Sequence, residues 1–288
     1  MPEPDRITAA ADALRAAERD RAPIAPLIST YPGLDAADAY RIQLLNIDRR
    51  IEAGGAIVGH KVGLSSKAMQ DMMGVDEPDY GHLLADMAVV GSARAERYCQ
   101  PRVEPEVGFL LGTDLPGEGC TEADALAATE AIAPAFELID SRIRDWKIAL
   151  PDTIADNASS AGFVLGSARV DPRTVDLTTI PVRMFRNGDE VGVGRSDAVL
   201  GNPLVAVAWL ARTVARFGVR LRAGHVILPG SCTRAIDARP GDLFEADFGS
   251  LGPVRLAFRP LLTDAPRTDA TSSASSAQSS IPSQRGGS

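Results

Sequence analysis

The chain has 288 residues, of which 45% are hydrophobic, and a formal net charge of −8 with an isoelectric point near 5.0. That apolar content is enough to bury a substantial core, so the sequence predicts a globular protein rather than a fibre. The acidic balance argues against a nucleic-acid partner, because phosphate backbones are held mainly by clustered lysines and arginines.

Membrane and disulfide signals are both missing from the sequence. No window approaches the run of about eighteen apolar residues that a membrane span needs, and the N-terminal MPEPDRITAA lacks the basic and then apolar order of a signal peptide. We therefore expect a cytoplasmic protein without a membrane partner. The three cysteines, Cys99, Cys120 and Cys232, show no CxxC spacing, which suggests neither a disulfide framework nor a zinc knuckle.

Residues 1–55 are expected to form a helical region. Thr8 can cap a helix that runs to about Arg19. A second helix after Leu34 is indicated by apolar residues at spacings of four, three and four: Tyr40, Leu44, Ile47 and Ile51. Gly54 and Gly55 then end the helix.

The segment AIVGHKVGL, residues 56–64, is predicted to be a strand. His60 lies on the face of Val58 and Val62, whereas Lys61 shares the opposite face with Gly59 and Gly63 and so has space around it. Lys61 could pair with a substrate carboxylate as a point charge, or it could be a surface lysine.

The next segment, DEPDYG at residues 76–81, is predicted to be a turn because proline and glycine interrupt regular structure. Asp79 within it could serve as a general acid or base. An ordinary turn aspartate would give the same pattern.

A strand predicted for residues 102–112, RVEPEVGFLLG, carries Glu104 and Glu106 on one face. Neighbouring carboxylates repel each other, and a hard divalent cation such as Mg²⁺ or Mn²⁺ between them would relieve that repulsion. Two solvated carboxylates on an exposed face are the alternative. Pro105 cannot donate to a ladder, which suggests the edge or mouth of a sheet.

A helix capped by Thr121 is expected to lead to Pro134 and the apolar run AFELID. Glu137 lies inside that run, where a buried carboxylate without a partner would be costly. A metal ion would be one such partner, and a salt bridge to Arg142 or Arg144 would be another. Residues 141–166 then read as mostly irregular before another strand, and long irregular stretches are often functional.

The second half of the chain is richer in strand signals. Asn187-Gly188 is a type I′ hairpin signal, and Asn202, Pro203 and Gly218 fit the cap, first position and end of one intervening helix. Short strands are expected from residue 225 to 258. The sequence thus predicts an α+β fold with a rolled, largely antiparallel sheet.

Two further boundaries follow from composition. Residues 56–262 are expected to form a β-rich catalytic domain, and residues 263–288 a disordered Ser-rich tail with too few apolar groups to offset the entropy of ordering.

The histidines, His60, His82 and His225, show no ligand-like spacing and are not assigned to a metal. The sequence has no Walker loop and no GxSxG elbow, which disfavours nucleotide cofactors and serine hydrolysis.

Several segments together resemble the 2-keto-4-pentenoate hydratase family (2-hydroxypenta-2,4-dienoate hydratases) of the fumarylacetoacetate hydrolase-like superfamily. They span about residues 10–260 in the family's order: GHKVGLSSKAMQ, GVDEPDYGHL, PRVEPEVGFLL, DSRIRDWKI, DTIADNASSAGFVLG, and GHVILPGS with PGDLFEADFGSLG. The resemblance implies a fumarylacetoacetate hydrolase-like fold, a mixed β-roll with an N-terminal helical region. It also implies a homo-oligomer and leaves open association with other enzymes of the same pathway.

The resemblance further implies roles for particular residues. It places Glu104, Glu106 and Glu137 at the family's metal-ligand positions, for Mg²⁺ or Mn²⁺, and Lys61 and Asp79 at positions of substrate binding and proton transfer. Ser160, in the DNASS segment, would then face the substrate as a hydrogen-bond donor. The stretch CTRAID is similar to hydratases that accept a second carboxylate, so Arg234 is a candidate contact for that group, with a plain surface residue as the alternative.

The expected reaction is the addition of water to 2-hydroxypenta-2,4-dienoate or a substituted homologue, giving a 4-hydroxy-2-oxo acid in meta-cleavage degradation of aromatic compounds. One alternative is a 2-oxo-3-enedioate (4-oxalocrotonate) decarboxylase of the same pathway. Others are a non-catalytic partner subunit of that decarboxylase and a C–C bond hydrolase of the superfamily.

Overall fold

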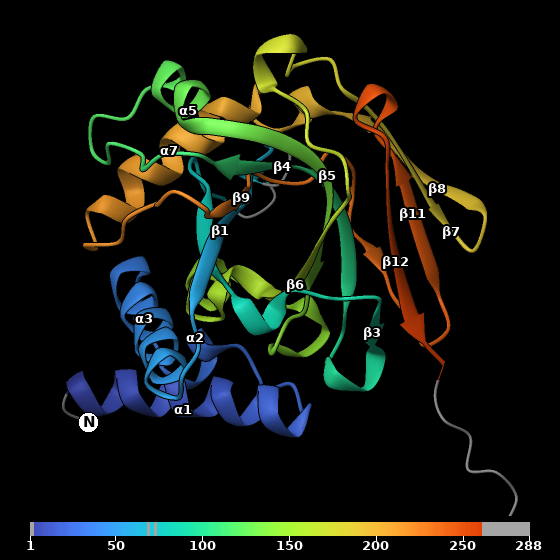
Figure 1. Cartoon of the computed structure of the whole chain (residues 1–288). Coiled ribbons are helices and arrows are strands. Elements are labelled where there is room, and N and C mark those ends of the chain that lie inside the picture. The colour runs from blue at the N-terminus through green and yellow to red at the C-terminus, as the bar shows by residue number, and fades with distance from the viewer. Residues whose placement is uncertain (1–2, 68–69, 72–73, 261–288) are drawn as a thin grey trace, which may run out of the picture.

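The computed structural model describes residues 3–67, 70–71 and 74–260, so the tail predicted for residues 263–288 lies outside it. Three helices open the chain and pack at one end of the molecule (Figure 1): α1 (Glu3–Asp20), α2 (Leu27–Thr30) and α3 (Ala36–Glu52). Thr8 lies within α1 rather than at its cap. Asp35 caps α3 by accepting a hydrogen bond from the Asp38 amide, and α3 packs on α1 and on the short helix α6 (Leu150–Ala155).

The larger sheet curls around the centre of the molecule (Figure 1). Its strand order is β2-β1-β9-β4-β5-β6, with β10 also paired to β4, and every pairing except β1 with β9 is antiparallel. Its strands are β1 (Ile57–Gly63), β2 (Asp79–Leu84), β4 (Arg102–Leu111), β5 (Thr129–Ile139), β6 (Ser160–Leu165), β9 (Val226–Leu228) and β10 (Ile236–Asp237). The predicted α+β fold with a rolled, largely antiparallel sheet is confirmed.

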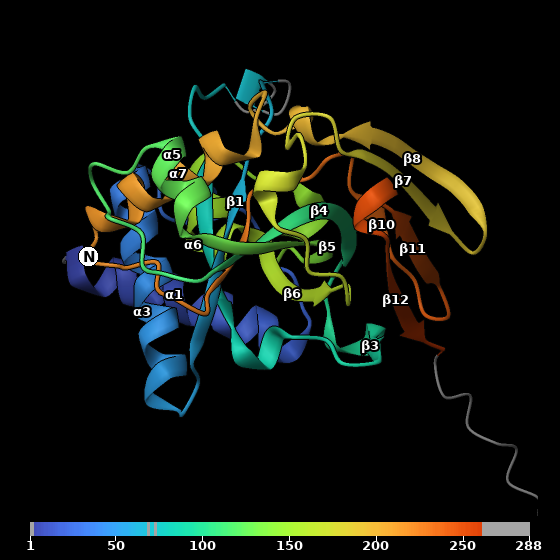
Figure 2. The ribbon, with the colours of Figure 1, turned by 45° about the horizontal axis from the view of Figure 1, so that its top comes forward.

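A second sheet stands beside the first (Figure 2), in the order β3-β12-β11-β7-β8. Its strands are β3 (Ser92–Arg94), β7 (Pro181–Arg186), β8 (Asp189–Arg195), β11 (Leu243–Asp247) and β12 (Pro253–Arg259). The predicted hairpin joins β7 to β8, with positive φ angles of 56° at Asn187 and 90° at Gly188. Strand β12 contacts β5 and β6, so the two sheets share a core.

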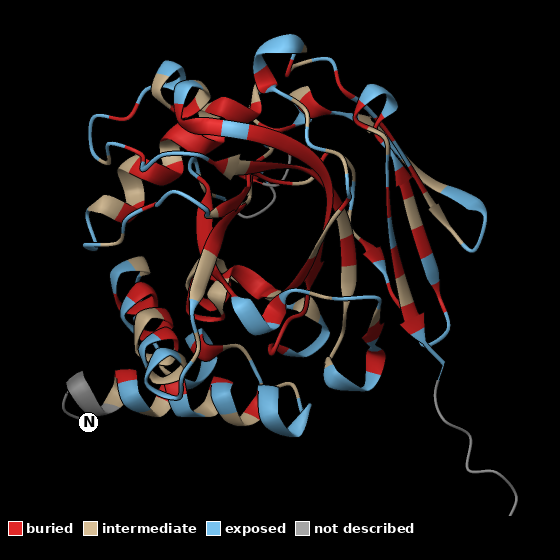
Figure 3. Ribbon diagram, viewed as in Figure 1, coloured by how far each residue is buried: buried red, intermediate tan, exposed pale blue. Residues whose placement is uncertain are grey.

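Two helices, α5 (Glu122–Ala128) and α7 (Pro203–Ala215), lie together against the curled sheet (Figure 1). Asn202 caps α7 by accepting from the Leu204 amide, and Gly218 follows its end with a φ of 74°, as predicted. Strand β5 is buried along almost its whole length (Figure 3), which makes it the centre of the core. Among the described residues, no helix combines the length and apolar character that crossing a membrane requires.

Two local predictions were wrong, in both cases because long-range strand pairing outweighs local preference. Asp79 is the first residue of β2 and not part of a turn, since β2 pairs with β1 from this residue onward. Helix α5 ends at Ala128, and Pro134 belongs to β5, which pairs with β4. The prediction for Pro105 holds in part. Strand β4 is an interior strand and not a sheet edge, but Pro105 lies between the pairings of β4 with β9 and with β10, so its missing N–H removes no ladder bond on that side.

Candidate active site and metal centre

Three glutamates converge where β4 pairs with β5. Glu104 and Glu137 are cross-strand partners, and Glu106 follows on the same face of β4. One carboxylate oxygen from each residue lies within 4.8 Å of the others. Glu106 and Glu137 are fully buried and Glu104 is half-buried, so these three carboxylates form a cluster inside the curled sheet rather than a solvated face.

Several of these carboxylate oxygens lack a hydrogen-bond donor. Glu106 Oε2 accepts from the Gly230 amide at 2.7 Å. Within the described part of the chain, Glu106 Oε1 and both oxygens of Glu137 accept no hydrogen bond. Lys61 lies near Glu137 Oε2, but Glu106 Oε1 and Glu137 Oε1 have no partner among the described residues. Buried acceptors of this kind are costly, so the arrangement fits a cation bound between the carboxylates.

Glu137 forms an ion pair with Lys61, whose Nζ lies 3.3 Å from Glu137 Oε2. The alternative of a salt bridge from Glu137 to Arg142 is therefore wrong, because Arg142 pairs with Asp156 at 2.5 Å. Arg144 is exposed and donates to the Pro23 carbonyl instead.

Burial and mutual repulsion shift the protonation of the three glutamates. Burial, followed by the charge of Glu137, raises the pKa of Glu104 to about 7. The pKa of Glu106 is also raised, first by burial and then by the negative charges of Glu137 and Glu104. Burial also raises the pKa of Glu137, although Lys61 and the Ser160 hydroxyl beside it act in the opposite direction. A divalent cation would offset this repulsion, and three carboxylates are a donor set that suits Mg²⁺ or Mn²⁺.

Lys61 projects from β1 toward the glutamates and is only 3% exposed. Its Nζ donates to the Ala158 carbonyl at 2.9 Å, in addition to the Glu137 contact. Burial lowers the pKa of Lys61, but Glu137 and the other nearby carboxylates more than compensate, so its pKa lies above the ordinary value. Lys61 is thus a buried ammonium group in the site, and the alternative of a surface lysine is wrong.

Asp79 lies next to Lys61, on the neighbouring strand β2, and is 1% exposed. Its Oδ2 accepts from the Thr153 hydroxyl at 3.0 Å, and its Oδ1 has no partner among the described residues. Burial raises the pKa of Asp79, against the opposing charge of Lys61. A carboxyl group with a raised pKa beside a fixed cation is suited to holding and transferring a proton.

Three of these groups line a cavity of about 780 Å³, whereas Glu106 and Glu137 are not among its lining residues. Lys61, Asp79 and Glu104 line it, and Arg234 lines it from an exposed position. Its apolar lining is drawn from several elements: Val62, Leu64, Ile139, Trp146, Ile148, Ala158 and Ala198. The cavity therefore combines an ionic end with an apolar wall, which is typical of small-molecule binding sites.

The serines of the DNASS segment divide between two sides of the structure. Ser159 lines the 780 Å³ cavity, whereas Ser160 lines a second cavity and has its hydroxyl next to Glu137. Ser159 was expected only as part of the DNASS segment, residues 156–160, which the resemblance implies to be a substrate-facing loop. Thr153 and the Gly230 amide were missed by the sequence analysis. The irregular stretch 141–166 was a signal for Thr153, and the sequence carried none for the Gly230 contact.

Comparisons with known proteins agree on one family. Residues 63–259 match the family described as fumarylacetoacetate (FAA) hydrolase C-terminal. The chain is 45% identical over 258 residues to a 2-keto-4-pentenoate hydratase of Paraburkholderia xenovorans, covering 88% of this chain and 96% of that one. It is 42% identical over 251 residues to a 2-hydroxyhexa-2,4-dienoate hydratase of Comamonas testosteroni, covering 86% and 94%.

One solved structure is similar over the same extent. A 4-oxalocrotonate decarboxylase from Pseudomonas putida, complexed with magnesium and adipate, matches with a TM-score of 0.84 and 36% sequence identity. The match covers 88% of this chain and 97% of that one.

Proposed function

Because the chain belongs to the 2-keto-4-pentenoate hydratase family, within the wider FAA hydrolase family, we propose that it adds water to 2-hydroxypenta-2,4-dienoate or a substituted homologue. It is an enzyme of the hydratase type, and the product would be a 4-hydroxy-2-oxo acid. The observation that carries this proposal is the convergence of Glu104, Glu106 and Glu137 with Lys61 and Asp79.

In this proposal the three glutamates hold Mg²⁺ or Mn²⁺, whose Lewis acidity, when the ion is bound, stabilises negative charge on the substrate's 2-oxygen. Lys61 offsets the charge of the substrate carboxylate and keeps it beside the glutamates. Ser160 lines the second cavity and not the one that holds Lys61 and Asp79, which does not support the expected contact with the substrate; its hydroxyl lies next to Glu137, to which it is proposed to donate.

Asp79 is proposed to move the protons. The dienol loses its 2-hydroxyl proton and gains one at C5, which gives a 2-oxo-3-enoate with an electrophilic C4. Water then adds its oxygen at C4, and the second proton ends on C3. Asp79 is buried, its pKa is raised, and its Oδ1 accepts no hydrogen bond from the described residues, so it can deliver the first proton and orient the water.

Decarboxylation of a 2-oxo-3-enedioate is the second candidate, because the chain is similar over most of its length to a 4-oxalocrotonate decarboxylase. Such a substrate carries a second carboxylate, and Arg234 is the proposed contact for it. A stabilising partner subunit of a decarboxylase would have no use for a converging carboxylate triad. Assembly into a homo-oligomer and association with pathway enzymes are further proposals, which light scattering on the purified protein alone and in mixtures would test.

The test is turnover with product identification. Purified protein, Mg²⁺ and freshly generated 2-hydroxypenta-2,4-dienoate are mixed, the loss of dienol absorbance is followed, and the product mass is determined. We expect a gain of one water, abolished by a chelator and by Glu106→Gln, and retained in Glu130→Gln, which alters an exposed residue of β5. Carbon dioxide release from 2-oxohex-3-enedioate without any hydration of dienoates would replace the hydratase with the decarboxylase.

A further inference from the structure

A short turn at residues 157–159 forms one wall of the candidate site and has an uncommon backbone conformation. Asn157, Ala158 and Ser159 have φ angles of 55°, 48° and 57°. This left-handed region is disfavoured for residues with a Cβ atom. Three successive residues stay there only where surrounding contacts hold them.

The side chain of Asn157 supplies such contacts at strand β2. Its Oδ1 accepts from the His82 amide at 2.8 Å, and its Nδ2 donates to the His82 carbonyl at 3.0 Å. Strand β2 is the outermost strand of its sheet, so the Asn157 amide takes the place of a neighbouring strand at this one residue. The fit is close, because a Cβ atom on Gly81 would come within 2.3 Å of the Asn157 carbonyl oxygen.

The turn delivers a backbone carbonyl to Lys61. Ala158 O accepts from Lys61 Nζ at 2.9 Å, and the same Nζ lies 3.3 Å from Glu137 Oε2. Ala158 and Ser159 both line the cavity that contains Asp79 and Glu104. A continuous set of contacts therefore runs from the backbone of β2, through Asn157 and Ala158, to the ammonium group of the site.

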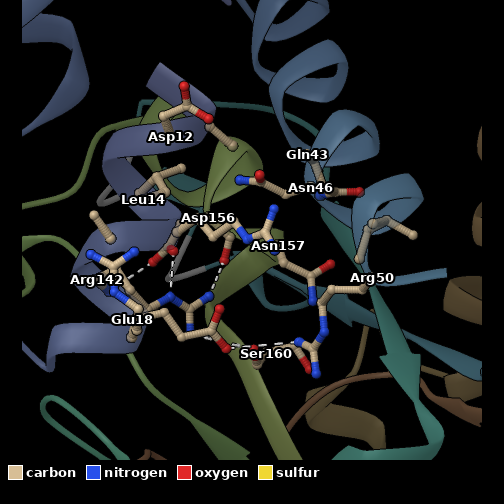
Figure 4. A pocket seen from close by; sticks show the side chains of 15 residues that line it. Asp12, Leu14, Glu18, Gln43, Asn46, Arg50, Arg142, Asp156, Asn157 and Ser160 are labelled. Atoms are coloured by element: carbon tan, nitrogen blue, oxygen red, sulfur yellow. Dashed lines mark hydrogen bonds and ion pairs between the residues drawn. The ribbon is translucent and has the colours of Figure 1, made fainter. Parts of the chain in front are cut away.

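On its other side the turn borders a second cavity of about 750 Å³, between it and helices α1 and α3 (Figure 4). Arg142 there pairs with Asp156, next to the turn, and donates to the Asp156 carbonyl. Asn46 lines the same cavity, but its amide donates to the Ala11 carbonyl in α1. Asn46 is thus an amide side chain in the same cavity whose hydrogen bonds do not involve the turn.

We propose that Asn157 is a positioning residue, which holds the left-handed turn so that the Ala158 carbonyl fixes the Lys61 ammonium group beside Glu137. Asn157 acts through Lys61 and the turn, not by touching the substrate. The inference concerns the placement of Lys61, and only its kinetic consequence rests on the proposed function.

The first test measures how readily Lys61 is acetylated, which needs no substrate. The chain has three lysines, and Lys67 and Lys147 are exposed, so they serve as internal references. In Asn157→Ala we expect acetylation of Lys61 to rise about tenfold relative to the other two lysines, since two hydrogen bonds are lost, and to stay unchanged in Asn46→Ala. Equal rates at Lys61 in wild type and Asn157→Ala, or a rise at all three lysines together, would overturn the proposal.

The second test separates the amide contacts from the strained backbone. Asn157→Gly removes the side chain, and glycine adopts a positive φ without strain. Acetylation of Lys61 should therefore be as fast in this variant as in the alanine variant. A glycine variant that behaves like wild type would mean that backbone strain alone matters, and the proposal would fail. Should the alanine variant not fold, Asn157→Asp keeps the acceptor for the His82 amide and should show a smaller rise in the same direction.

Turnover gives the matching kinetic result. In Asn157→Ala, kcat/KM should fall by roughly 10- to 100-fold while the affinity for Mn²⁺, measured by calorimetry, stays within about twofold, because the carboxylates are untouched and only Lys61 is displaced. Loss of Mn²⁺ binding together with turnover would contradict this. If wild type has no hydratase activity, the proposed function fails, whereas lysine acetylation still decides the role of Asn157.

Discussion

Gly63 and Asp79 lie directly opposite each other across the β1–β2 ladder, and a Cβ atom on residue 63 would come within 2.2 Å of Asp79 Oδ1. The same position is 3.5 Å from Lys61 Nζ. The absence of a side chain at residue 63 therefore leaves room for both of the groups that are proposed to handle charge and protons.

Gly63→Ala should displace the Asp79 carboxylate without changing any proposed metal ligand. Misplacement of a reacting group by about 1 Å costs roughly 100-fold in rate, so we expect kcat to fall by that order while Mn²⁺ binding is retained. Gly119→Ala is the matched control, because a Cβ atom there meets nothing within 4 Å. Steady-state kinetics and calorimetry on both variants decide the matter, and wild-type turnover in Gly63→Ala would argue against Asp79.

Glu106→Gln should stabilise the metal-free protein, because it removes one of three mutually repelling carboxylates while the amide oxygen can still accept from Gly230. We expect the free energy of unfolding to rise by roughly 1 kcal/mol. Mg²⁺ at a hundredfold excess over its Kd should stabilise wild type by about 2.7 kcal/mol and the variant hardly at all. Thermal melts with and without Mg²⁺ measure both effects. Equal stabilisation by Mg²⁺ in wild type and variant would place the ion elsewhere.

The side chains of His60 and His82 pack against each other on the face of β1 and β2 opposite Lys61, with ring centroids 4.8 Å apart. Among the described residues neither ring has a hydrogen-bond partner. Burial lowers the pKa of both, and that of His82 to about 4. The folded-state pKa lies below the ordinary value near 6.5, so this contribution to stability is complete above pH about 6.5 and is lost as the pH falls toward about 4.

Urea unfolding at pH 7 and pH 5 tests this effect. Wild type should lose more stability than His82→Phe over this interval, by about 2 kcal/mol, since about 1.5 pH units lie below the ordinary histidine pKa and one unit corresponds to about 1.4 kcal/mol. The Asn157 hydrogen bonds survive the substitution because they use the backbone of residue 82. Parallel pH profiles for the two proteins would show that His82 titrates in the folded protein near its ordinary pKa, which would contradict this prediction.

Much of the fold follows from local sequence patterns. The alternation around Lys61, the Asn187-Gly188 hairpin and the Asn202 cap were all predicted, because period-two alternation, positive-φ turns and helix caps depend on neighbouring residues. Glu104 and Glu106 were placed on one face by their spacing alone. Their approach to Glu137 requires the β4–β5 register, which the sequence suggested only through a family resemblance.

The rest of the site depends on contacts that no local pattern encodes. Thr153 contacts Asp79 across 74 positions of sequence, and the Gly230 amide meets Glu106 across 124. The left-handed backbone at Ala158 and Ser159 carries no glycine to signal it, since side-chain contacts with β2 hold it instead. The orientation of Ser159 and Ser160 was for that reason beyond sequence reasoning.

Arg234→Ala should change substrate preference rather than catalysis. Arg234 is exposed and lines the candidate cavity, so a distal substrate carboxylate near it would gain a charge-assisted but water-screened contact. We expect kcat/KM to fall about tenfold for a dienoate with a second carboxylate and to stay within about twofold for 2-hydroxypenta-2,4-dienoate. Arg239→Ala, an exposed arginine outside the cavity lining, is the control. An equal loss for both substrates would refute a contact with the distal group.

The most direct test of the account is the origin of the oxygen in the product. The Mg²⁺-loaded enzyme is supplied with 2-hydroxypenta-2,4-dienoate in water enriched in ¹⁸O, and the label is located by fragmentation in a mass spectrometer. We expect one ¹⁸O in a new hydroxyl group at C4, present in wild type and absent when Glu106 is replaced by Gln. A product without label at C4, or carbon dioxide release from 2-oxohex-3-enedioate as the sole reaction, would contradict it.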